Sequence, residues 1–187
     1  MLTRFCSTIL LLLTMVMVCS LAAPAIEEHH GIFVGTVMKL DAGAKTVVVK
    51  LGDGTEHTFH FVKRTTVHGA EDTAAAAKDS FHGLKEGSQV AVHYTAKGSD
   101  ETAEEFDNIG RDGLKSTEGT VTRIDRGGKT LTVKAADGTD QVYRLTDSAA
   151  KDAGEDIGAG TEKTAKVTVY YTEEGGHKVA HFFRKAL

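Results

Sequence analysis

The chain has 187 residues, 26% of them charged, and a formal net charge of −4 at pH 7. Residues 31–110 carry 8 Lys/Arg against 12 Asp/Glu, and residues 111–187 carry 13 against 12. Neither half has the basic excess that repeated phosphate contacts require, so we expect no nucleic-acid partner.

The first 25 residues have the pattern of a secretory signal peptide. Arg4 precedes the apolar run Ile9–Cys19, which is short for a membrane span, and small residues allow cleavage after Ala22 or after Ala25. The sequence therefore predicts a periplasmic or secreted protein with no transmembrane segment after cleavage.

Both cysteines of the chain, Cys6 and Cys19, lie in this segment. The mature chain is then free of thiols, which excludes disulfides, thiolate nucleophiles and zinc–thiolate sites.

Beyond the signal segment the chain contains an internal repeat. Residues 35–61 align without a gap to residues 119–145, and 12 of the 27 positions are identical. The offset of 84 residues is longer than the periods of solenoid repeats, which run to roughly 50 residues. We interpret the repeat as a duplicated small domain, with the first copy at 26–110 and the second at 111–187.

Each copy is predicted to contain three strands, a short helix and two more strands. In the first copy, alternating apolar residues and the Asp53-Gly54 turn signal predict the order of these elements. The expected strands are Ile32–Leu40, Thr46–Leu51, Thr55–Val62, one through Val90–Tyr94 and Thr102–Ile109, and the expected helix is Glu71–Phe81.

The second copy repeats this order after a linker expected at Gly110–Thr117. The offset between the copies changes from 84 to 77 across the helical segment, so the difference in length falls there. The expected strands are Thr120–Ile124, Thr130–Ala135, Thr139–Leu145, one through Val167–Tyr171 and His177–Arg184, with a helix in Asp147–Ile157.

A β-β-β-α-β-β order is that of the OB fold, a small five-stranded barrel. The predicted fold class is therefore all-β with one short helix per repeat, arranged as two tandem OB-like barrels of five antiparallel strands. The predicted core residues are Phe59, Phe61, Val90, Val92 and Tyr94 in the first copy and Tyr143, Leu145, Val167, Val169 and Tyr171 in the second.

The shared motifs are Gly-Thr-Val, Lys-Thr-(Val/Leu)-x-Val-Lys, Asp-Gly-Thr and Val-x-Val-x-Tyr. Together they resemble the tandem small OB-like β-barrel modules of unknown function found in bacterial exported proteins. The resemblance implies a barrel fold and a location outside the cytoplasm, and it carries over no catalytic residues.

Histidines are the candidates for a metal site, because imidazole binds copper, nickel and zinc. His60 and His93 lie on the outward phase of two predicted strands, and Arg144 and Tyr170 replace them in the second copy. The two rings can share an ion only if their strands are neighbours in register. We expect instead that both rings are separated and face water.

Acidic pairs at 100–101 and 104–105 are expected to form a solvated strand edge. No Gly-x-Ser-x-Gly elbow, P-loop or EF-hand loop occurs in the sequence. We therefore expect neither an enzyme nor a cofactor.

The leading hypothesis is an exported, non-enzymatic tandem β-barrel module that binds an unidentified ligand or partner, or has a structural role, in the cell envelope. Two alternatives stay open. One is a periplasmic protein that binds Cu, Ni or Zn through the first-copy histidines, and the other is an OB module for oligosaccharides or oligonucleotides.

Overall fold

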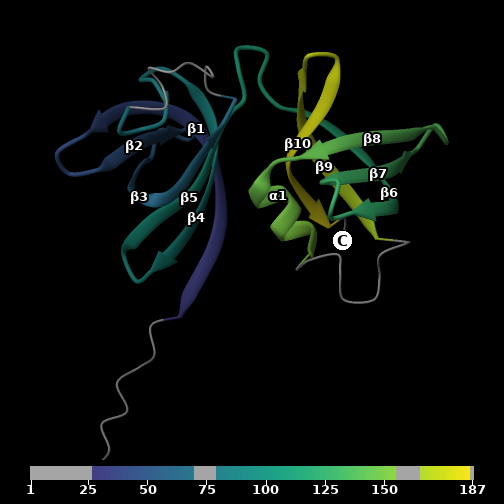
Figure 1. Cartoon of the computed structure of the whole chain (residues 1–187), viewed down its shortest axis with the longest axis horizontal. Coiled ribbons are helices and arrows are strands. Elements are labelled where there is room, and N and C mark those ends of the chain that lie inside the picture. Colours follow the sequence, from purple (N-terminus) through teal and green to yellow (C-terminus); the bar gives the residue numbers. More distant parts are fainter. Residues whose placement is uncertain (1–26, 70–78, 155–164, 186–187) are drawn as a thin grey trace, which may run out of the picture.

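The computed structural model describes residues 27–69, 79–154 and 165–185, which form two β-barrels lying side by side (Figure 1). The expected signal segment and most of the helix expected at 71–81 fall outside these residues. The first barrel contains β1 (Glu28–Asp41), β2 (Thr46–Leu51), β3 (Glu56–His68), β4 (Gln89–Lys97) and β5 (Asp100–Asn108). The second contains β6 (Lys115–Asp125), β7 (Thr130–Ala135), β8 (Asp140–Leu145), α1 (Asp147–Asp152), β9 (Lys166–Glu174) and β10 (His177–Lys185).

Both barrels are closed and share one strand order, which confirms the predicted OB-like fold class. In the first barrel the order is β1-β2-β3-β5-β4, with β4 paired again to β1. The second repeats it as β6-β7-β8-β10-β9. The expectation that every strand pair is antiparallel was wrong, because β5 runs parallel to β3 and β10 runs parallel to β8. In each barrel the fifth strand pairs antiparallel with the fourth on one side and parallel with the third on the other.

The helix predicted in the second copy is confirmed as α1. Thr146 caps its N-terminus by accepting a hydrogen bond from the backbone N–H of Ala149. The linker is shorter than expected, since Lys115–Thr117 already belong to β6 and pair with β9.

Each barrel has its own hydrophobic core, so the duplication gives two separately cored units. The β2 and β7 strands show the same burial pattern, with Val47 and Val49 matched by Leu131 and Val133. All ten predicted core residues lie in these two cores, and Tyr94 is the one that is only partly buried. Alternation along each strand therefore predicted the inward faces correctly.

A glycine marks the bend of the first strand in each barrel. Gly35 pairs with Leu51 of β2 and with Val90 of β4, so it lies where β1 passes from one neighbour to the other. A Cβ at Gly35 would lie 2.4 Å from a carbonyl oxygen of β2, and the equivalent Gly119 has the same 2.4 Å clearance to β7. The Gly of the repeated Gly-Thr-Val motif is therefore required for this close approach of the first and second strands.

The two barrels meet along a surface that we call the seam. It joins the outer faces of β4 and β5 to α1, β9 and β10 of the second barrel (Figure 1). Part of the seam is apolar, where Phe182 packs with Ala91 and Ile109, all three being at most 5% exposed. Within the described residues, none of the helices has the length and apolar character needed to cross a membrane.

Candidate functional site

The polar part of the seam begins with three first-barrel residues whose positions follow from strand register. His93 of β4 is paired directly with Glu105 of β5, and Asp107 lies two residues farther along β5. Residues two apart on a strand share a face, so all three side chains emerge from the outer face of the barrel. All three are buried, with exposed fractions of 3%, 3% and 0%.

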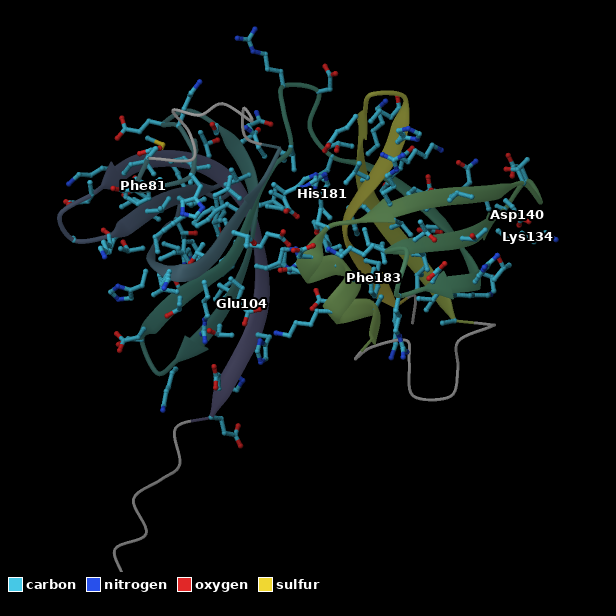
Figure 2. The ribbon with its side chains drawn as sticks, viewed as in Figure 1. Phe81, Glu104, Lys134, Asp140, His181 and Phe183 are labelled. Atoms are coloured by element: carbon cyan, nitrogen blue, oxygen red, sulfur yellow. The ribbon has the colours of Figure 1, made fainter. Side chains whose placement is uncertain are left out.

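The second barrel covers these side chains, and a β-bulge in β10 contributes to the cover. Ala180 and Phe183 both lie in the core of the barrel, although strict alternation would put them on opposite faces. The register shifts between Ala180 and Phe182, so His181 is the additional residue of the bulge. His181 and Phe182 therefore both lie outside the core, and Figure 2 shows His181 facing the first barrel.

Asp107 is the centre of the polar contacts. Its Oδ2 lies 3.1 Å from Nδ1 of His181 and 3.7 Å from Nε2 of His93, and it accepts a hydrogen bond of 3.4 Å from the Thr146 hydroxyl. Burial by itself would raise the pKa of Asp107, but its contacts with the two imidazoles and their charges hold that pKa below its usual value.

Two polar atoms in this cluster are not satisfied. Among the described residues, nothing forms a hydrogen bond with Oδ1 of Asp107, and Nδ1 of His181 is close to Asp107 without the alignment of a hydrogen bond. Both residues are 0% exposed. A buried carboxylate oxygen without a donor is costly, which makes this the chemically unusual point of the seam.

His93 is held at both ring nitrogens. Its Nε2 lies 2.9 Å from the backbone carbonyl oxygen of His181, and its Nδ1 lies 3.4 Å from Oδ2 of Asp152. Burial would lower the pKa of His93, but the contacts with Asp107 and Asp152 and their negative charges outweigh it and raise the pKa to about 10. In the absence of other ligands His93 is a buried cation between two carboxylates.

Glu105 is held by the first turn of α1. Its Oε2 accepts a hydrogen bond of 2.7 Å from the backbone N–H of Ser148, while Oε1 accepts a weak one of 3.4 Å from Thr66. Beside it, Glu104 contacts Lys151 of α1 at 3.2 Å. Carboxylates of β5 are therefore bound from across the seam at several points.

A cleft of about 320 Å³ connects this cluster with solvent, and we call it the seam cleft. Its walls carry charges of both signs: the carboxylates of Glu104 from the first barrel and Asp152 from the second, and the guanidinium group of Arg184 from the second. The guanidinium group of Arg184 lies over the ring of Tyr170, 5.9 Å from its centroid. The remaining lining residues are His30, Gly31, Ile32, His93 and Tyr94.

The structure does not place His60 and His93 on neighbouring strands. His60 is exposed on β3, and β5 lies between β3 and β4. The expectation that both rings face water was wrong for His93. Its side chain does leave the first barrel on the outward side, as its phase predicts, but the second barrel packs over it.

The acidic pairs are also not a solvated edge. In a closed barrel β5 has neighbours on both sides, and Glu105 is buried in the seam. Asp107, Asp152 and His181 were not identified from the sequence. A signal for His181 was present, because two apolar residues three apart in one strand, Ala180 and Phe183, indicate a bulge.

The sequence matches no known protein family, and no curated protein matches it significantly. Among solved structures, the chain is similar to Ag(I)CusF, with 13% identity, a TM-score of 0.31, and coverage of 42% of this chain and 95% of that one. It is also similar to apo-CusF residues 6–88 from Escherichia coli, with 15% identity, a TM-score of 0.31, and coverage of 40% and 88%. A third similarity is to Drosophila Unr CSD456, with 12% identity, a TM-score of 0.36, and coverage of 86% and 63%.

Proposed function

We propose that this protein is an exported, non-enzymatic binding module of the cell envelope, and that the seam cleft is its ligand site. The observation that carries the proposal is that side chains of both barrels line one cleft that reaches solvent. Ligand sites prefer such concave places between domains, where a few charged groups converge.

The charges of the cleft favour a small solute that carries both a positive and a negative group. An acid can pair with Arg184, and an amine can pair with Asp152 or Glu104 in addition to their contacts with His93 and Lys151. A volume of about 320 Å³ suits a molecule of this size and is small for a chain of sugars or nucleotides.

The surroundings of His93 argue against catalysis. The Asp152–His93 pair resembles the acid and base of a catalytic triad, in which the second ring nitrogen faces a nucleophile. Here that nitrogen, Nε2, faces the carbonyl oxygen of His181 at 2.9 Å. A carbonyl oxygen has no proton to give up, so the pair orients the ring without activating a nucleophile.

The test is chemical-shift mapping of the metal-free mature protein with three probes: glycylglycine, chitotetraose and a short oligothymidine. We expect glycylglycine to shift the amides of 30–32, 94 and 184, and the two polymers to shift none. Arg184→Gln should abolish the effect, while Arg144→Gln, a change on the exposed part of β8, should leave it intact. A polymer that shifts the β2–β3 face, or glycylglycine without any effect, would contradict the proposal.

Export rests on the signal pattern of residues 1–25 and has its own test. Mass spectrometry of the protein from the envelope fraction should find a chain that begins between Ala23 and Ile26. Recovery of the chain with Met1 intact in that fraction would contradict export by cleavage.

A further inference from the structure

We propose that His93, Glu105 and Asp107 bind one divalent transition-metal ion of the Zn²⁺ type in the seam. This inference rests on the proposed binding role of the seam and assigns it a first ligand. The three side chains each offer one donor atom, and these atoms all lie within 4.8 Å of one another.

One of the donor-to-donor distances is close to that of a metal centre, and the others are within 4.8 Å. Bonds of about 2.0–2.1 Å place the donor atoms of a tetrahedral site about 3.3 Å apart. Nε2 of His93 and Oδ2 of Asp107 are 3.7 Å apart. Small side-chain movements would therefore bring the donors together, and β4 and β5 are hydrogen-bonded neighbours that hold them rigidly.

The unsatisfied Oδ1 atom of Asp107 is a second, independent observation in favour of a bound cation. Asp107 is fully buried, yet its Oδ1 has no hydrogen-bond partner among the described residues. A cation that takes Oδ1 as a donor, alone or together with Oδ2, would provide the missing interaction. The carboxylate of Glu105 adds a second negative charge at the same place, as a divalent ion requires.

The second barrel is positioned to orient these ligands. Asp152 contacts Nδ1 of His93, so Nε2 is the donor in the carboxylate–histidine–metal arrangement of many metal sites. To bind the ion, Nε2 gives up its proton and its 2.9 Å contact with the carbonyl oxygen of His181. The backbone N–H of Ser148 binds Glu105, and His181 contacts Asp107. The ion would reach the site through the seam cleft, because His93 is one of the residues that line it.

Ligand chemistry selects the type of ion. One imidazole and two carboxylates suit Zn²⁺, Co²⁺ or Mn²⁺, whereas Cu⁺ and Ag⁺ prefer sulfur ligands. At the offset of 77, the second copy has Tyr170, Phe182 and Arg184 in the three equivalent places. We therefore expect one site per chain.

The experiment is calorimetric titration of the untagged mature protein with Zn²⁺ and optical titration with Co²⁺. The wild type should bind one ion per chain, and Asp107→Asn and Glu105→Gln should each weaken binding at least about 10-fold, as expected for loss of a ligand. The matched controls are His60→Ala, on the exposed part of β3, and His29→Ala, on the exposed start of β1 and outside the seam cleft. These controls should bind as the wild type does.

Absence of Zn²⁺ and Co²⁺ binding, or binding that the His29→Ala variant removes, would overturn the inference. If a seam variant does not fold, the site can be located in the wild type from the paramagnetic shifts that Co²⁺ causes in the amide signals. The largest shifts at residues 91–94 and 105–108 would support the seam site, and the largest shifts at residues 28–30 would refute it. The glycylglycine experiment is done without metal, so its success with failure here would leave the proposed function intact.

Discussion

Replacing Phe182 with alanine tests whether the seam joins the two barrels into one cooperative unit. Phe182 is 3% exposed, packs with Ala91 and Ile109 of the first barrel, and stacks on Tyr170 with ring centroids 4.5 Å apart. Phe→Ala in a packed interior costs about 3–5 kcal/mol, depending on how far the surroundings collapse into the cavity. Because Tyr170 is only partly buried and can move inward, we expect about 3 kcal/mol here, at the lower end of that range.

The assay is native-state hydrogen exchange at two equivalent amides, Val49 of β2 and Val133 of β7, whose side chains are both 0% exposed. Phe182→Ala should lower the free energy of opening at both amides by similar amounts. The comparison variant Phe183→Ala removes a ring from the core of the second barrel, and in one cooperative unit it should also lower the free energy of opening at both amides. A Phe182→Ala effect under about 0.5 kcal/mol at Val49 would refute the coupling, because changes of that size are typical of surface substitutions.

Three further predictions concern the barrels themselves. Phe61→Ala should lower the free energy of unfolding of the first barrel, measured with urea, by roughly 3–5 kcal/mol, because it removes a side chain from the core. A loss under about 1 kcal/mol would contradict the placement of Phe61 in the core. Gly35→Ala and Gly119→Ala should each lower the free energy of unfolding by at least about 1–3 kcal/mol in the same assay, because the added Cβ would overlap a backbone carbonyl oxygen. No change in stability would mean that the neighbouring strand can accommodate the Cβ. The pKa values of Asp53 and Asp137 should fall below 3.8 in an NMR titration, because each carboxylate accepts hydrogen bonds from the side chain and backbone N–H of the threonine two residues later. Because the pKa is lowered, the two carboxylates stabilise the folded state fully above pH 3.8, and this stabilisation is lost as the pH falls through their pKa values in the folded protein. A titration midpoint of 3.8 or higher for either carboxylate would contradict these hydrogen bonds.

The fold could be predicted from the sequence because the strand pattern of one copy could be compared with that of the other. A strand pattern that occurs twice, as in Thr46–Leu51 and Thr130–Ala135, identifies inward and outward faces more securely than one copy would. The parallel pairing of β3 with β5 was missed, since alternation shows which face a residue occupies but gives no information about the neighbouring strand.

The candidate site was mostly missed, and the reason is physical. His93 was placed on the correct face, but that face is covered by a second barrel whose docking depends on side chains far away in the sequence. His181 lies 88 residues from His93 and faces the seam through a bulge. Packing between the two barrels leaves no periodic pattern in β4 or β10. The alternation along β4 therefore predicted that the outer face of this strand is solvated.

A double-mutant cycle between Asp107 and His181 tests most directly that residues of both barrels share one buried polar seam. The Oδ2 and Nδ1 atoms lie 3.1 Å apart and both residues are 0% exposed, so solvent screening is small. Urea unfolding of the metal-free Asp107→Ala, His181→Ala and double variants should give a coupling free energy of about 1–3 kcal/mol, as found for buried contacting residues. A coupling within about 0.3 kcal/mol of zero would mean that the two residues do not meet in solution.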